Sequence, residues 1–261
     1  MLLEEKIEVA INDLQELEPP EGFLVCFSGG KDSVVMYDLV KRSGVKYKAM
    51  HTFISIEPPP LIDFIKNEYP EVEIEYPEKN IEELIVKHGI LPYRKMRYCH
   101  RELKSGNVEW LKVLGVRAEE SAKRAKRAKL VESEKFGRSL NLIFDWTTQD
   151  VWKYIFTKNI KYCHLYDEGR KRIGCLFCPF ENNQQASRDL REFPEIARNM
   201  INACQIAVSN RQAKGLPDIS KRGTPLAKTG KEMFFKWLSG GRGQMTPAEL
   251  EKIYDDSIKN L

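Results

Sequence analysis

Residues 28–33, Ser-Gly-Gly-Lys-Asp-Ser, combine two glycines, two hydroxyls, a lysine and a carboxylate. An apolar run, residues 23–27, precedes them, and residues 34–40 continue with apolar side chains at helical spacing. Where a strand turns into a helix, free backbone N–H groups and the positive end of the helix dipole attract an anion. Glycines let a phosphate approach the backbone, the hydroxyls donate hydrogen bonds, and Lys31 adds charge. The segment therefore predicts a phosphate-binding loop on an exposed turn; the alternative is a tight turn in which glycine serves geometry alone.

Four of the six cysteines have the spacing of metal ligands. Cys175 and Cys178 form a C-x-x-C pair followed by a proline, Cys163 lies twelve residues before Cys175, and Cys99 lies further upstream. The two thiolates of a C-x-x-C turn can share one metal, and two distant thiolates complete a tetrahedral set. Four thiolates suit zinc and a [4Fe–4S] cluster equally. A redox-active thiol pair and plain burial are the alternatives.

The elements that must position these groups alternate between strand and helix. Strands are predicted at residues 23–27, 45–53, 72–77 and 140–146, with a further strand-like end in 108–117. Helices are predicted at residues 1–18, 34–40, 58–70, 80–89 and 148–159. This alternation is typical of an α/β fold with an open, twisted, mainly parallel sheet and helices on both faces. Cys26 and Cys204 have apolar neighbours at strand and helix spacing, so both are expected in the core.

The alternation stops after about residue 165, which predicts two parts. Residues 1–165 are expected to form a nucleotide-binding α/β domain that includes the N-terminal helix. Residues 166–261 would carry the cysteine motif and a basic helical region, with helices at 193–215 and 246–261. A ligand of such a sheet is expected at the carboxyl ends of its strands.

Charge and hydropathy limit which partners and which cellular compartment are expected for this protein. The chain has 261 residues, of which 42% are hydrophobic, and a net charge of +4. Residues 211–242 carry eight bases against two acids, which predicts either a polyanionic partner or a solvated charged face. The sequence has no basic-then-apolar leader and no apolar run of bilayer length, so we expect a cytoplasmic protein without a membrane partner. In that reducing compartment, cysteines serve as metal ligands, catalysts or core residues.

The loop at residues 28–33 lacks the spacings G-x-x-x-x-G-K-[ST] and G-x-G-x-x-G. Its sequence, SGGKDS, resembles the signature of the PP-loop ATP pyrophosphatases. Residues 115–124, GVRAEESAKR, resemble the G-x-R-x-x-E-S-x-x-R pattern of the phosphoadenosine phosphosulfate reductase branch, and residues 145–155 and 166–180 also resemble that branch. The similarity covers about residues 20–182 and implies an adenine nucleotide alpha hydrolase-like fold.

The resemblance implies that the loop holds the phosphates of ATP with Mg²⁺ and that residues 117–124 line the same cleft. A guanidinium can hold a phosphate through two hydrogen bonds, and a carboxylate can hold Mg²⁺ or another arginine. Lys31, Asp32 and Arg117 are the expected catalytic residues. A surface basic helix is the alternative for the two arginines, because the charge continues through residues 123–129. The implied nucleotide-binding residues are Ser28, Gly29, Gly30, Lys31, Asp32, Ser33, Arg117, Glu120, Ser121 and Arg124.

For the cysteines, the resemblance favours a [4Fe–4S] cluster over zinc. Assimilatory reductases of the branch carry their cluster on a paired-cysteine motif, whereas Cys99 is the single cysteine of its segment. One upstream cysteine with a later C-x-x-C is similar to the pattern of the ATP pyrophosphatases of DNA phosphorothioation. The predicted ligands are therefore Cys99, Cys163, Cys175 and Cys178, and the site would carry sulfur or support the domain.

The leading interpretation is an ATP pyrophosphatase that adenylates an acceptor in a sulfur-transfer reaction. Basic segments at residues 94–104, 117–138 and 211–242 suit a nucleic-acid acceptor, and a sulfur-donor protein such as a cysteine desulfurase is a further candidate partner. One alternative is a phosphoadenosine phosphosulfate reductase, although those enzymes attack with a C-terminal cysteine and no cysteine follows Cys204. The other is a non-catalytic nucleotide-binding subunit. The sequence leaves the oligomeric state open.

Overall fold

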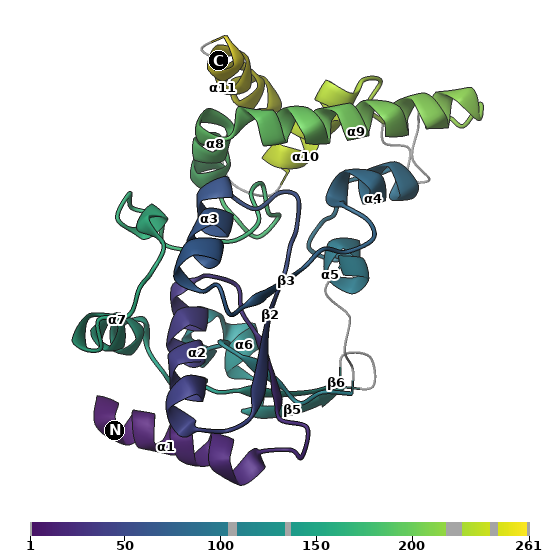
Figure 1. Cartoon of the computed structure of the whole chain (residues 1–261). Helices are drawn as coiled ribbons and strands as arrows, with labels where there is room; N and C mark the ends of the chain where they lie inside the picture. Colours follow the sequence, from purple (N-terminus) through teal and green to yellow (C-terminus); the bar gives the residue numbers. More distant parts are fainter. Residues whose placement is uncertain (1, 104–108, 134–136, 218–225, 241–244, 260–261) are drawn as a thin grey trace. The chain divides into compact units, whose positions relative to one another are not determined.

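A computed structural model describes residues 2–103, 109–133, 137–217, 226–240 and 245–259. The chain forms two compact units, each with its own hydrophobic core (Figure 1). The sheet unit comprises Met1–Phe53, Pro59–Tyr76 and Ser105–Gly174. The helical unit comprises Ile54–Pro58, Pro77–Lys104 and Cys175–Leu261. The sheet unit therefore runs nine residues beyond the predicted boundary at residue 165, and the helical unit also takes two earlier segments of the chain.

The sheet unit is built on six strands in the order β3-β2-β1-β4-β6-β5. All neighbours are parallel except β5 and β6, which pair antiparallel at one edge. The central strand β1 has three fully covered side chains in succession, as expected for a strand buried on both sides. The predicted mainly parallel α/β sheet is thus confirmed. The strands are β1 (Phe23–Cys26), β2 (Tyr47–Thr52), β3 (Glu73–Glu75), β4 (Lys112–Leu114), β5 (Leu130–Ser133) and β6 (Gly137–Asn141).

Helices of the sheet unit begin and end where the sequence provides signals. In α2, Gly30 is the N-cap and Gly44 ends the helix in the left-handed conformation, with φ of 75°. Helix α1 buries a stripe at helical spacing, and α1 and α7 both pack on α2. The helices and 3₁₀ turns of this unit are α1 (Leu3–Leu17), α2 (Lys31–Ser43), α3 (Pro59–Glu68), η1 (Ala118–Glu120), α6 (Ala122–Ala125), α7 (Thr148–Thr157) and η2 (His164–Tyr166).

The predicted strand at residues 140–146 is wrong in its position. Strand β6 ends at Asn141, and residues 142–145 form turns in which Phe144 N–H donates to the Asn141 carbonyl and Trp146 N–H to the Ile143 carbonyl. Leu142 and Ile143 are nevertheless fully buried. The apolar run therefore includes the end of a strand and a buried turn. Hydrophobic periodicity alone does not distinguish a buried turn from a strand.

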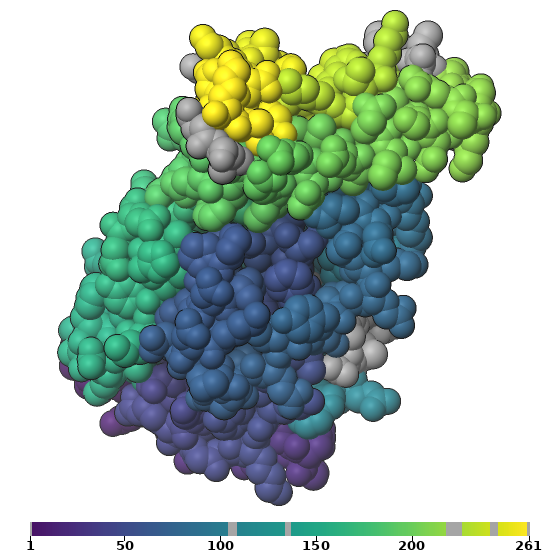
Figure 2. Space-filling model, turned by 45° about the horizontal axis from the view of Figure 1, so that its top comes forward, coloured from purple at the N-terminus to yellow at the C-terminus, as the bar shows by residue number. Residues whose placement is uncertain are grey.

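The helical unit packs around α9, which contacts α4 and α10, while α8 packs on α11. In Figure 2 these C-terminal helices are the green to yellow surface. The predicted helices at 80–89, 193–215 and 246–261 are confirmed, whereas α5, α8 and α10 are additional. Cys204 lies in the core, as predicted, and burial raises the pKa of its thiol to about 12. The helices are α4 (Ile81–His88), α5 (Tyr98–Leu103), α8 (Asn183–Glu192), α9 (Pro194–Ala213), α10 (Gly230–Ser239) and α11 (Pro247–Ile258).

Within the described ranges, no helix combines the length and the apolar character needed to cross a bilayer.

Candidate functional site

The candidate site is the loop between β1 and α2 in the sheet unit. Gly29 has φ of 69°, and a Cβ there would lie 2.6 Å from Leu61 Cδ1 of α3, so both conformation and space require glycine. Ser33 Oγ donates to the Gly30 carbonyl at 2.9 Å and accepts from Ser28 N at 3.3 Å. Its contact with Ser28 Oγ, at 3.2 Å, closes the loop on itself. The two predicted serines therefore fix the loop's conformation.

Several backbone N–H groups of this loop are available to bind an anion. Among the described residues, none accepts from the N–H groups of Gly29, Gly30 or Asp32. Lys31 N–H, by contrast, donates to Tyr166 Oη at 2.9 Å. Because unsatisfied N–H groups at a helix N-terminus bind phosphate well, the geometry agrees with the predicted phosphate-binding loop.

Asp32 links the loop to Arg117, which lies in the second signature segment, residues 115–124. Its Oδ2 lies 2.9 Å from Lys31 Nζ and its Oδ1 lies 2.7 Å from Arg117 Nε. Lys31 is only 6% exposed, so its predicted place on an exposed turn is wrong: the stem is buried and the ammonium is held by a carboxylate. The carboxylate therefore orients two cations at the start of α2, which suits a ligand that carries negative charge.

Arg117 is buried and its guanidinium is held from several sides. Besides Asp32, it donates through Nη1 to Glu119 Oε2 at 2.7 Å and through Nη2 to Thr148 Oγ1 at 3.2 Å. The backbone N–H of Thr148 and then the Arg117 guanidinium lower the pKa of Glu119. With its donors engaged in this way, Arg117 holds the Asp32 carboxylate in place, and its catalytic role stays a prediction. Glu119 and Thr148, which complete the arrangement, were not predicted.

The remaining predicted residues of this segment are held locally. Glu120 accepts from Arg117 N at 2.9 Å and pairs with Arg124, and Ser121 caps α6 by accepting from Arg124 N at 3.2 Å. A Cβ at Gly115 would lie 3.0 Å from the carbonyl group of Asp32, which shows how closely this segment packs on the start of α2. The structure thus connects residues 28–33 with Arg117 directly, and with Glu120, Ser121 and Arg124 through Arg117.

Residues 22–181 match the phosphoadenosine phosphosulfate reductase domain. The chain belongs to the phosphoadenosine phosphosulfate reductase family. The match confirms the branch that the two signatures, residues 28–33 and 115–124, predict.

Relatives of this family member differ in length. An uncharacterized protein of Methanocaldococcus jannaschii is 31% identical over 67% of this chain and 46% of its own length. The adenosine 5'-phosphosulfate reductase of Bacillus pumilus is 32% identical over 58% of this chain and 70% of its own length. The phosphoadenylyl-sulfate reductase structure from Candida auris is 18% identical, with a TM-score of 0.46, over 67% of this chain and 96% of that one. The chain spans less than half the length of the two Methanocaldococcus jannaschii relatives that it matches.

The four predicted metal ligands of this family member are divided between the two units. Cys163 is buried in the sheet unit, where burial raises the pKa of its thiol, and the other three belong to the helical unit. In the part of the chain that the structure describes, no three His, Cys, Asp or Glu side chains form a group that could hold a metal. The soft thiol donors suit zinc or an iron–sulfur cluster, but their four-sulfur arrangement stays a prediction.

The C-x-x-C turn itself has a defined conformation. Phe177, between the two cysteines, adopts φ of 57°, which is uncommon for a residue with a side chain. Its N–H donates to Asp189 Oδ2 at 3.2 Å, and Leu176 N–H donates to the Ile56 carbonyl at 2.7 Å. The turn that presents Cys175 and Cys178 is therefore held by a buried acid twelve residues away.

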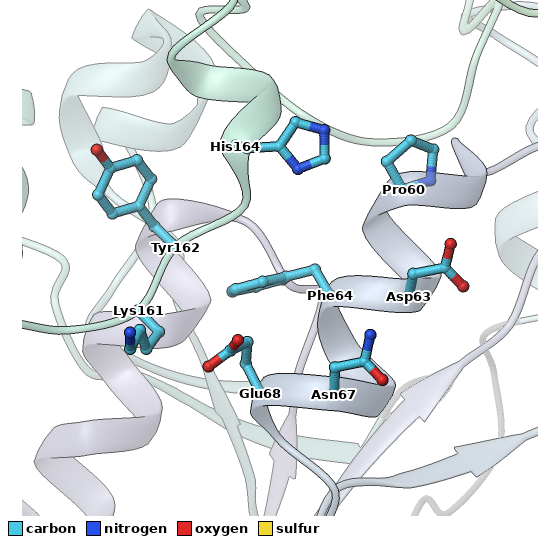
Figure 3. Close-up of a pocket in the computed structure, with 8 residues that line it drawn as sticks. All are labelled: Pro60, Asp63, Phe64, Asn67, Glu68, Lys161, Tyr162 and His164. Carbon is cyan, nitrogen blue, oxygen red and sulfur yellow. The ribbon is translucent and has the colours of Figure 1, made fainter.

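A hollow of about 560 Å³ lies in the sheet unit between α3 and residues 161–164 (Figure 3). Phe64 stands at its centre, with Asp63 and Asn67 on the α3 side and His164 on the other. Helix α3 also contacts the loop through Leu61, and η2, which begins at His164, ends at Tyr166. The hollow is thus flanked by the two elements that touch the loop. Its lining is Pro60, Asp63, Phe64, Asn67, Glu68, Lys161, Tyr162 and His164.

Proposed function

We propose that this protein is an ATP pyrophosphatase that adenylates an acceptor in a sulfur-transfer reaction. The observation that carries the proposal is the loop. At the start of α2, N–H groups that have no acceptor among the described residues lie beside a lysine, and a carboxylate joins that lysine to a buried arginine. Such an arrangement binds a polyphosphate and can stabilise charge as one of its bonds breaks. ATP, entering with Mg²⁺, is the substrate that this chemistry fits.

The proposed first step forms one bond and breaks one. An acceptor oxygen attacks the α-phosphorus of ATP, the bond to the bridging oxygen breaks, and pyrophosphate leaves with the electron pair. Lys31 and the N–H groups of Gly29 and Gly30 would bind the departing phosphates, while Arg117 keeps Asp32 oriented. The acceptor then carries AMP, a leaving group that a sulfur nucleophile displaces. A cluster on Cys99, Cys163, Cys175 and Cys178 would hold or deliver sulfur.

Nucleic acid is the proposed class of acceptor, and a cation-rich surface next to Arg117 supports it. Lys123, Lys126 and Arg127 are exposed on and after α6, and no described residue pairs with them. Arg124 and Lys129 lie in the same run but are paired with acids. Three exposed cations in the segment that follows Arg117, with no described partner, suit the phosphates of a nucleic-acid backbone. A sulfur-donor protein, such as a cysteine desulfurase, is the partner that the second step requires.

The test is the formation of AMP and pyrophosphate from ATP and Mg²⁺, measured with and without bulk RNA. Wild-type protein is expected to release pyrophosphate, and Asp32→Asn to lose at least a hundredfold because two cations lose their shared carboxylate. Asp256→Asn, on the exposed end of α11, is the matched control that keeps wild-type rates. No AMP under any condition, with ATP bound, would favour a non-catalytic nucleotide-binding subunit instead.

Sulfonucleotide reduction is the second candidate, because relatives such as that of Bacillus pumilus are adenosine 5'-phosphosulfate reductases. Its direct test is thioredoxin-dependent release of sulfite from adenosine 5'-phosphosulfate or its 3'-phosphorylated form. We expect none from the 261 residues tested, since they contain no cysteine after Cys204. Robust sulfite release would replace the ATP pyrophosphatase assignment.

A further inference from the structure

Tyr166 closes one side of the phosphate-binding loop and was not predicted as part of it. Its hydroxyl oxygen accepts from Lys31 N–H, the first backbone donor of α2, at 2.9 Å. Lys31 Nζ lies 5.9 Å from the centre of the tyrosine ring, and Trp152 packs edge-on against that ring at 5.2 Å. The side chain is therefore held between the loop and α7, with its hydroxyl at the position where a helix N-terminus binds oxygen ligands.

The hydroxyl proton of Tyr166 is available for a ligand. A tyrosine hydroxyl has one proton to donate and also accepts. Here the oxygen accepts from backbone, and within the described ranges no protein group accepts the proton. Burial raises the pKa of Tyr166, against the opposing effect of the backbone hydrogen bonds, so the proton is retained at neutral pH. A partly buried donor beside a phosphate loop is expected to have an acceptor when the ligand is present.

Gly30 provides the second, independent observation. Its φ of −76° is accessible to any residue, so the backbone conformation does not require glycine. A Cβ at Gly30 would lie 3.4 Å from Tyr166 Oη and 3.5 Å from Ser28 Oγ, both ordinary contact distances, with the Ile173 carbonyl at 3.9 Å. The protein alone would therefore accommodate alanine at this position. What a methyl group would remove is the small space between the two hydroxyls.

We propose that this space beside Gly30 is the subsite for a phosphoryl oxygen of the bound nucleotide, and that Tyr166 donates its hydroxyl proton to that oxygen. The inference rests on the proposed function for the identity of the ligand, and it adds a binding residue from η2 to the loop. Ser28 Oγ, which donates its own proton to Ser33 Oγ, also borders the space, and Gly30 is glycine because the ligand oxygen needs the room. The Ile173 carbonyl, which also borders the space, restricts the oxygen to the side of the two hydroxyls.

The test measures equilibrium binding of inorganic pyrophosphate and of ATP with Mg²⁺ to the full chain, separately from turnover. Tyr166→Phe is expected to weaken both ligands about tenfold or more, as for a lost hydrogen bond to a charged group. Gly30→Ala is expected to fold normally and weaken them at least as much. Tyr162→Phe is the matched control: it also packs edge-on against Trp152, at 5.3 Å, but its hydroxyl donates to Asp167 and not to the loop.

Two outcomes separate this inference from the proposed function. Wild-type affinity in both Tyr166→Phe and Gly30→Ala overturns the inference, whether or not the protein forms AMP. Weakened binding in both variants, with wild-type binding in Tyr162→Phe, supports the subsite even if no AMP is formed and the proposed function fails. Thermal unfolding of each variant guards against a general loss of structure, and Gly30→Ala keeps the test valid if Tyr166→Phe does not fold.

Discussion

The loop at residues 28–33 and the C-x-x-C turn at residues 175–178 are each held by an aspartate, and the two aspartates contact different kinds of group. In the sheet unit, Asp32 contacts two cations, Lys31 and Arg117, beside backbone donors that have no acceptor in the described residues. In the helical unit, Asp189 accepts from two neutral donors, Phe177 N–H and Gln185 Nε2. The first arrangement gathers positive charge for a ligand, whereas the second fixes the turn that carries Cys175 and Cys178.

The difference shows which kind of loop can be recognised in a sequence. A loop that gathers charge for a ligand contains its own glycines, hydroxyls and lysine within six residues. In a loop whose conformation depends on a distant acid, only the cysteine spacing can be recognised in the sequence. The local pattern predicts neither the left-handed conformation of Phe177 nor the contact with Asp189. Each prediction below changes one side of this comparison.

The largest effect is expected for Arg117→Ala. Removing the guanidinium leaves Asp32 and Glu119 without a shared cation, so pyrophosphate formation should fall at least a hundredfold. The free energy of unfolding should fall by about 3 kcal/mol at most, because both carboxylates keep some contact with water. Arg117→Lys keeps the charge but not the fork of donors, and we expect an intermediate rate.

The matched control for Arg117→Ala is Arg198→Ala, whose side chain pairs with Glu195 in the first turn of α9, outside the basic segments. Turnover and urea unfolding would be measured for all three variants. An Arg117→Ala protein with the wild-type rate would separate Asp32 from the chemistry and leave the loop as a structural turn.

The second effect concerns the helical unit and its cysteines. Cys175→Ala is expected to lose the bound metal, and Cys204→Ala, a core substitution, to retain it at a cost of about 1 kcal/mol in stability. Iron, acid-labile sulfide and zinc, measured on protein purified without oxygen, provide the readout. Stoichiometric iron and sulfide would support the cluster and zinc a structural site, whereas metal lost from Cys204→Ala alone would show that the ligand set is wrong.

The third effect is a smaller change in the same unit. Asp189→Ala leaves the Phe177 N–H without its acceptor, which should lower the free energy of unfolding by about 1–3 kcal/mol. Nucleotide binding should be unchanged, and the metal content should fall because the C-x-x-C turn relaxes. Asp256→Ala, which removes an exposed pair with Lys259, serves as the control in urea unfolding. A loss of nucleotide binding in Asp189→Ala would contradict the separation of roles between the two aspartates.

The sequence predicted those parts of the site that lie close together along the chain. The loop and the alternation of strands and helices around it could be recognised because each depends on neighbouring residues, whereas Arg117 was implied by the family resemblance of residues 115–124. Tyr166 could not be recognised, because it contacts Lys31 from 135 residues away along the chain. In its own segment, the visible signals are the cysteines and the family resemblance. Thr148 is only the first residue of a predicted helix, yet its hydroxyl and N–H hold Arg117 and Glu119 in place.

The missed helices have a physical explanation of their own. Helix α8 has a polar sequence in which an asparagine, a serine and an aspartate are buried beside Ala186 and Leu190, so its apolar stripe is weak. Helix α10 follows a stretch rich in glycine and lysine, and its first residue, Gly230, lies so close to α9 that a Cβ would be 2.4 Å from Gln205 N. Tertiary packing therefore decides both helices more than local preference does.

The smallest effect is the acid sensitivity of the two units. The Lys87 ammonium, followed by His88 and Arg101, lowers the pKa of Glu102 in the helical unit to about 2, and Thr148 N–H and Arg117 lower that of Glu119 in the sheet unit. A lowered carboxyl pKa in the folded state stabilises the fold above the ordinary pKa of about 4.5, and this stabilisation is lost as pH falls through the folded value. Glu102→Gln should therefore flatten the pH dependence of stability between about pH 4.5 and pH 2, in the helical unit alone.

Hydrogen exchange of peptides from residues 77–103 and 112–157 measures the stability of the two units separately. Glu78→Gln, which changes an exposed glutamate of the helical unit, is the control. Equal flattening in both groups of peptides would show that the two units unfold together in acid, and the contrast between their loops would then not extend to their stability.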